Sequence, residues 1–143
     1  MRGLVCRLLG GGGLVLLLAL TVGCSSKPEM AHVSGKVTFQ GKPVPAGWIS
    51  FTPESGKGSV RMCYIKDGVY DSSKEPDPGI HPGKNMVKIA GFDGNKMPYW
   101  VQGKQIFNMV DETFDVPAGS TTKDWGIPES AGKNVKITPT ADE

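Results

Sequence analysis

The sequence predicts an all-β protein, an antiparallel Greek-key sandwich of about seven strands that follows an N-terminal signal helix. Among the 143 residues, 20 are Gly and 11 are Pro, a content typical of a chain with many turns. Short segments that alternate apolar and polar residues recur at close spacing, which is the pattern of half-buried strands. After the N-terminal segment, no apolar repeat of helical period is sustained, and the remaining length suits one domain.

The clearest strand is the first, because Val33, Val37 and Phe39 alternate with polar or small residues and share one face. Ile49 and Phe51 are expected to face the core from the second strand, and Val87 and Ile89 from a later one. The predicted strands cover residues 33–39, 48–52, 59–65, 69–70, 85–92, 105–110, 112–116 and 134–138.

Two connections have strong turn signals. Asp67 and Gly68 stand between two apolar runs, and this pair is favoured at a hairpin tip because both positions must accept positive φ. The strands on either side, residues 59–65 and 69–70, are therefore expected to pair antiparallel. Residues 72–83 hold three prolines and two glycines, which predicts a surface loop.

The first 23 residues have the anatomy of a secretory signal peptide. Arg2 and Arg7 give a basic start, residues 14–22 are apolar, and Gly23 is a small exit residue. The apolar run is shorter than the roughly 20 residues that a spanning helix needs. We therefore expect residues 1–23 to be removed, residues 24–31 to form a polar linker, and residues 32–143 to form the domain.

The exit of this segment looks like a bacterial lipobox, with Gly23 before Cys24 and a polar stretch after it. This resemblance implies a diacylglycerol on Cys24 and a protein exported to the cell envelope and held at the membrane through that lipid, as a palmitate-bearing lipoprotein would be. Two or more acyl chains give stable anchoring where one is marginal. Ser25 after the cysteine favours the outer membrane by the same resemblance. The alternatives are an uncleaved anchor or ordinary cleavage nearby.

Charge excludes some partners of the mature chain. Removal of residues 1–23 leaves 14 basic and 14 acidic residues, so the formal net charge falls from +2 to zero. Nucleic-acid binding needs a clustered basic surface, and attraction to anionic lipid needs a polybasic segment. We expect no nucleic-acid partner.

Five phrases resemble the carboxypeptidase regulatory-like domain, a transthyretin-like or immunoglobulin-like β-sandwich found in many short bacterial lipoproteins. They lie, in the family's order, at residues 35–39, 41–45, 49–53, 65–70 and 82–89. The resemblance covers about half of the mature chain and implies a fold and a compartment more than an activity. Beyond residue 93 the sequence departs from the family pattern.

Catalytic and metal-binding patterns are absent from the sequence. His32 and His81 stand outside any zinc-ligand spacing, so we expect no metal and no cofactor. Asp77 shares a loop with His81, and an enzyme of unknown class would need both to converge with another acid. Cys63 is the thiol left over, and its place in an alternating stretch predicts a small buried side chain.

Aromatic residues are the remaining binding candidates. Tyr99, Trp100 and Trp125 lie in segments that resemble loops, where exposed rings stack on sugars or anchor protein partners. Alternatively, these rings cover the ends of a thin core. We expect a non-catalytic, lipid-anchored envelope module with a binding or structural role, with envelope polysaccharide or another surface protein as partner. A carbohydrate-binding surface protein that uses these loop aromatics is the alternative.

Overall fold

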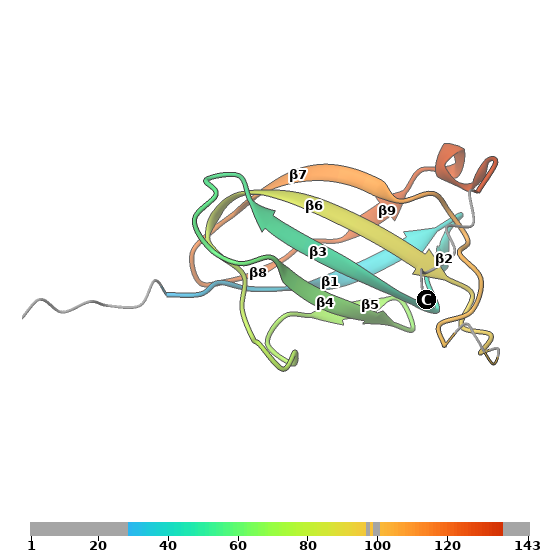
Figure 1. Ribbon diagram of the computed structural model, residues 1–143, viewed down its shortest axis with the longest axis horizontal. Coiled ribbons are helices and arrows are strands. Elements are labelled where there is room, and N and C mark those ends of the chain that lie inside the picture. The colour runs from blue at the N-terminus through green and yellow to red at the C-terminus, as the bar shows by residue number, and fades with distance from the viewer. Residues whose placement is uncertain (1–28, 97, 99–100, 136–143) are drawn as a thin grey trace, which may run out of the picture.

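A computed structural model describes residues 29–96, 98 and 101–135 of the chain, and it is nearly all β (Figure 1). The regular elements of this described part are nine strands and one short 3-10 helix. The elements are β1 (His32–Phe39), β2 (Lys42–Pro43), β3 (Ala46–Pro53), β4 (Arg61–Lys66), β5 (Val69–Asp71), β6 (Gly83–Phe92), β7 (Val110–Val116), β8 (Ser120–Thr122), β9 (Trp125–Ile127) and η1 (Glu129–Gly132). Among the described residues, no helix is both long and apolar enough to cross a membrane.

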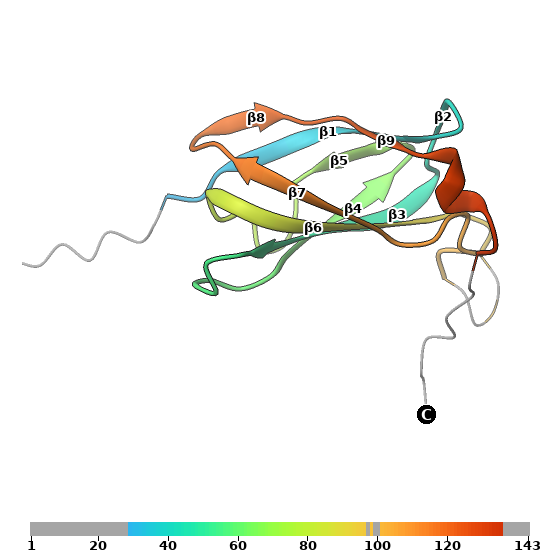
Figure 2. The same ribbon diagram turned by 90° about the horizontal axis from the view of Figure 1, so that it is seen from above.

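The strands form one curled sheet in the order β2-β1-β5-β4-β3-β6-β7, and β8 and β9 add to β1. Seen from above, β1 and β8 lie in one layer, called the first layer below, and β3 and β6 lie in the other, the second layer (Figure 2). This arrangement confirms the β-sandwich. The longest ladders join β3 antiparallel to β6 and β6 antiparallel to β7. The core lies between the two layers.

The alternating residues face this core as predicted. Val33, Val37, Ile49, Phe51, Val87 and Ile89 are all fully buried, and Phe39 packs against them. Each such side chain stabilises the fold by about 1.5–3 kcal/mol through the apolar area that it removes from water. Cys63 is buried on the same inner face of β4, as its alternating segment predicted.

The predicted hairpin is confirmed. Asp67 and Gly68 have φ angles of 50° and 75°, so both adopt the left-handed conformation of a tight two-residue turn. Lys66 pairs antiparallel with Val69 across it. Residues 72–82 form the predicted loop, although Ile80 makes an isolated bridge to Ala31 and β6 already begins at Gly83.

The structure corrects the prediction of a strand at residues 105–110. There Gln105 makes only an isolated bridge to Phe92, and regular pairing starts at Val110. Phe107 accounts for the difference, because it is fully buried and its ring centroid lies 5.2 Å from that of Phe39. The segment is apolar because it inserts a side chain into the core, not because it belongs to a ladder.

The closing strand is also different from the prediction. Asn134 and Val135 follow the 3-10 helix and form no strand, and the rest of the predicted strand, residues 136–138, lies outside the described residues. The first layer is completed instead by β8 and β9, which run parallel to β1. Each has only three residues, which is too short for alternation to be recognised in a sequence. The antiparallel prediction therefore fails at these two ladders.

A hydroxyl-lined trough as candidate functional site

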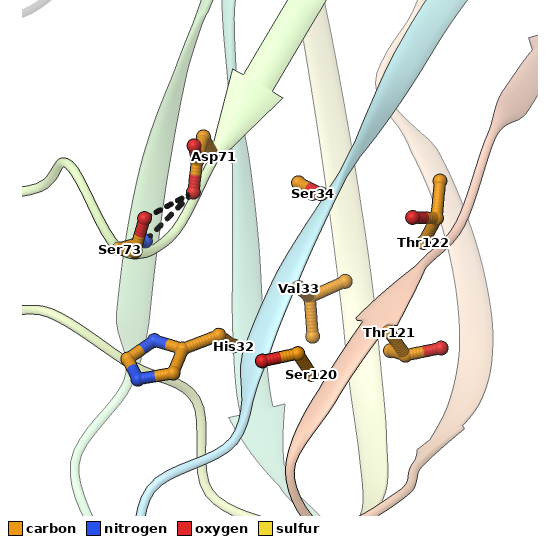
Figure 3. A pocket seen from close by; sticks show the side chains of 8 residues that line it. All are labelled: His32, Val33, Ser34, Asp71, Ser73, Ser120, Thr121 and Thr122. Atoms are coloured by element: carbon orange, nitrogen blue, oxygen red, sulfur yellow. Dashed lines mark hydrogen bonds between the residues drawn. The ribbon is translucent and has the colours of Figure 1, made fainter.

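The outer face of the first layer is hollowed where β1 is flanked by β5 and β8. The hollow has a volume of about 540 Å³. Figure 3 shows the residues that line it: His32, Val33, Ser34, Asp71, Ser73, Ser120, Thr121 and Thr122. Five of these eight side chains carry a hydroxyl, one is a carboxylate and one is an imidazole. The hollow therefore offers hydrogen-bonding groups rather than an apolar lining.

Strand register places these groups in rows. Ser34 on β1 is paired with Asp71 on β5 and, on its other side, with Thr122 on β8. His32, two residues earlier on the same face of β1, is paired with Ser120. Neighbouring strands are about 4.8 Å apart, so each row is a ladder of polar groups at that spacing.

Asp71 is held by its neighbours. The backbone amide and the hydroxyl of Ser73 both donate to Oδ1 of Asp71, at 3.0 and 2.6 Å, and Lys74 Nζ lies 3.2 Å from Oδ2. The hydrogen bonds from the Ser73 hydroxyl and amide, followed by Lys74, lower the pKa of the Asp71 carboxyl. The group is thus an ionised acceptor of fixed orientation at neutral pH.

A second hollow of about 470 Å³ continues the first along β1. The two share Ser34, Asp71 and Thr122, and the second extends to Lys36, Val69 and Asp124. Oδ1 of Asp124 accepts a hydrogen bond of 2.8 Å from the backbone amide of Lys36, which fixes that carboxylate at the far end. We refer to the two hollows together as the trough.

The arrangement does not form a catalytic triad. His32 and Asp71 share the trough, but Asp71 bonds to Ser73 and Lys74, and no hydrogen bond joins it to the imidazole. Nucleophilic catalysis by a serine needs a base that is hydrogen-bonded to both the nucleophile and an orienting acid.

The two loop residues that the enzyme alternative singled out, Asp77 and His81, each have another neighbour. Asp77 forms an ion pair with Arg61. His81 lies against Gly58, where a Cβ atom would come 2.6 Å from the imidazole Nε2. In the described part of the chain, no three His, Cys, Asp or Glu side chains come together in a way that could hold a metal ion.

The structure places one of the three candidate aromatic residues. Trp125 lies in β9 rather than in a loop, and only 7% of it is exposed. Its indole packs edge-on against Phe114, with ring centroids 6.0 Å apart, so it belongs to the core and offers no free face for stacking. This agrees with the alternative that such rings cover the core. Tyr99 and Trp100, like Cys24, lie outside the described residues.

Two other aromatic residues are adjacent on the outer face of the second layer. Trp48 on β3 is paired with Tyr64 on β4; Trp48 is half-buried and Tyr64 is 54% exposed. Met62 is exposed on the same face of β4. In the sequence, Trp48 stands out only as the start of a predicted strand, although an aromatic residue at an outward position of an alternating strand is a recognisable signal.

The residues of the trough were not predicted as a site, and the cause differs from that for Trp48. Their outward phase on β1 was predictable from the alternation of Val33 and Val37, but β8 was not predicted at all. Much of the lining therefore comes from a segment without a sequence signal.

Comparison with known proteins adds a distant similarity. No family model and no curated protein matches the sequence. Among solved structures, the chain is similar to a DUF3823 family protein from Parabacteroides merdae ATCC 43184, with 15% sequence identity and a TM-score of 0.41. The match covers 70% of this chain and 46% of that chain, so this chain spans about half of that protein's length.

Proposed function

We propose that this protein is a lipid-anchored β-sandwich module of the bacterial cell envelope, and that it binds a ligand in the trough rather than catalysing a reaction. The observation that carries the binding role is the state of the trough hydroxyls. Those of Ser34, Ser120 and Thr122 line the hollow, and within the described part of the chain none of them is hydrogen-bonded to protein. They are available to a ligand.

The anchoring role is supported by the sequence before β1. Residues 1–23 have the anatomy of a signal peptide, and the lipobox-like cysteine, Cys24, stands eight residues before His32. A chain of eight residues spans at most about 29 Å when fully extended. Since β1 begins at His32, lipidation of Cys24 would hold the His32 end of the trough close to the membrane surface.

The non-catalytic role is supported by the resemblance of the chain to the carboxypeptidase regulatory-like domain, which implies a fold and a compartment rather than an activity. It is also supported by Asp71, whose carboxylate is bonded to Ser73 and Lys74 and, among the described residues, makes no hydrogen bond to the nearby His32. By the resemblance of the lipobox region, Ser25 directs the module to the outer membrane.

Substitution of Cys24 tests the anchor. The Cys24→Ala variant and the wild-type chain would be expressed in a bacterium that is fed a radiolabelled or alkyne-bearing palmitate, and membranes would be separated by flotation. We expect lipid label and membrane partitioning for wild type and neither for Cys24→Ala. The matched control is Cys6→Ala, in the segment expected to be removed, which should behave as wild type. Lipid label that persists in Cys24→Ala would contradict the anchor.

A further inference from the structure

We propose that the trough is a carbohydrate-binding site, and that it takes an uncharged saccharide whose hydroxyls bond to β8, β1 and β5. This inference rests on the binding role proposed above and names the class of ligand. It assigns sugar binding to the sheet face around Ser34 instead of to loop aromatics.

The first argument is the spacing of the polar groups. Asp71, Ser34 and Thr122 form one row across three adjacent strands, with steps of about 4.8 Å. His32 and Ser120 form a second row, displaced by two residues, or about 6.6 Å, along β1. The two rows together form a grid of polar groups, and the spacings between neighbouring groups are comparable to the width of one sugar ring. A ligand with hydroxyls around a ring can therefore meet several of these groups at once.

The second argument is the chemistry of the groups. A hydroxyl side chain both donates and accepts, and so do the hydroxyls of a sugar. Asp71 adds an ionised acceptor, and hydrogen bonds to charged groups are stronger than those between neutral groups. Because Ser73 holds Oδ1, the carboxylate does not have to be ordered when a ligand binds.

The third argument compares an uncharged saccharide with two other classes of ligand, phosphates and apolar molecules. A phosphate placed over Ser34 would lie one strand spacing from the ionised Asp71 and would be repelled, although Lys74, 3.2 Å from Oδ2 of Asp71, offsets part of that charge. An apolar ligand over the first hollow would leave its hydroxyls desolvated and unpaired, because Val33, the apolar residue there, is fully buried in the floor. In the second hollow Val69 is half-exposed, so that end of the trough offers an apolar contact beside its polar groups. A neutral, hydroxyl-rich molecule avoids both costs.

The length of the trough indicates more than one sugar unit. From His32 to Lys36, β1 advances by four residues, or roughly 13 Å. The second hollow continues in line with the first and ends at Asp124. An extended oligosaccharide laid along β1 fits this shape better than a single ring does.

The experiment is an NMR titration of the isotopically labelled full chain in detergent micelles, using maltotriose, mannotriose and chitotriose as probes. We expect at least one trisaccharide to shift the backbone amide signals of Ser34, Asp71 and Thr122. Failure of all three probes to bind, or shifts that gather at Trp48 and Tyr64 instead, would overturn the assignment.

Matched variants show whether the trough itself is responsible. Thr122→Val keeps the side-chain shape and removes one hydroxyl, so affinity should fall by about two- to tenfold, which is the worth of one neutral hydrogen bond. Asp71→Asn removes the charge and should weaken binding by about tenfold or more. Thr113→Val, at an exposed position on β7 of the other layer, should leave the affinity unchanged. Equal losses in Thr122→Val and Thr113→Val would contradict the site.

The trisaccharide titration and the Cys24→Ala anchoring test can fail independently of each other. A chain that floats with membranes and binds no trisaccharide overturns the carbohydrate assignment and leaves the anchor standing. A chain that binds a trisaccharide in the trough but carries no lipid on Cys24 overturns the anchor and supports the site.

Discussion

The indole Nε1 of Trp125 donates a hydrogen bond of 3.1 Å to the phenol oxygen of Tyr70, and that phenol donates in turn to the carbonyl of Lys123 at 2.7 Å. Tyr70 is 1% exposed, so the hydrogen bond from Trp125 is buried, and the one to Lys123 is partly buried. It joins β5 to the segment between β8 and β9. β5 pairs with one edge of β1, and β8 and β9 pair with the other edge. The relay therefore links the β5 side of the trough to the chain that follows β8 on its other side.

Loss of the phenol oxygen should destabilise the fold. In Tyr70→Phe, the indole N–H of Trp125 and the carbonyl of Lys123 both lose their partner, and unpaired buried groups cost about 1–3 kcal/mol. Urea denaturation should show this decrease in the free energy of unfolding at an unchanged m value. The control is Tyr64→Phe, whose ring is exposed, and its effect should stay within about 0.5 kcal/mol. Equal stability of the two variants would mean that the relay contributes nothing.

Close packing of β1 against the β8–β9 connection makes Gly35 sensitive to substitution. A Cβ atom at Gly35 would come 2.0 Å from the carbonyl oxygen of Lys123, so the backbone would have to move. We expect Gly35→Ala to lower the free energy of unfolding by about 1–3 kcal/mol or more, as overpacking does. Gly126→Ala is the control, because nothing lies within 4 Å of a Cβ there. Thermal unfolding followed by circular dichroism measures both, and a wild-type midpoint for Gly35→Ala would rule out the clash.

Cys63 should be unreactive in the native protein. Burial, and then the negative charges of Glu75 and Asp71, raise the pKa of its thiol from the ordinary value of 9.0 to about 12. The thiolate is the reactive form, so at pH 8 we expect a Cys24→Ala, Cys6→Ala chain to resist iodoacetamide until urea unfolds it. Mass spectrometry measures the labelling. Rapid labelling of the folded chain would show that the thiol is accessible.

The same raised pKa predicts a pH dependence of stability. The folded state favours the neutral thiol, so its contribution is fully present below pH 9 and is lost as the pH rises from 9 towards 12. Over that window, the wild-type chain should lose more of its free energy of unfolding than Cys63→Ala does. Parallel stability curves for the two chains would contradict this.

Ser73 should control the ionisation of Asp71. The Ser73 hydroxyl is the largest cause of the lowered pKa of the Asp71 carboxyl, so Ser73→Ala should raise that pKa towards its ordinary value of 3.8. Because the folded-state pKa is lowered, the carboxylate stabilises the fold above that ordinary value and ceases to do so as the pH falls through the folded-state pKa. A carbon-13 NMR titration of the Asp71 carboxyl measures the shift, with Ser55→Ala as a distant control. An unchanged midpoint in Ser73→Ala would show that the hydroxyl has no such effect.

Local pattern was enough to predict much of the fold. Alternation identified the inner faces of β1, β3 and β6, and Asp67 with Gly68 marked the hairpin, because side-chain phase and turn conformation are set by residues that are neighbours in sequence. The burial of Cys63 followed from the same alternation. Where apolar residues served a non-local purpose, as Phe107 does in the core, the same reasoning predicted a strand that does not form.

From its sequence alone, this protein is determined to be a β-sandwich, and its leading segment predicts export and a lipid on Cys24. Only the tertiary structure decided that β8 and β9 pair with β1, that Trp125 is bonded to Tyr70 rather than exposed, and that Asp71, Ser34 and Thr122 form one row. The reason is physical. Each of these features depends on contacts between residues far apart in the chain, and such pairing is selected by the packing of the whole core, so no short stretch of sequence contains its signal.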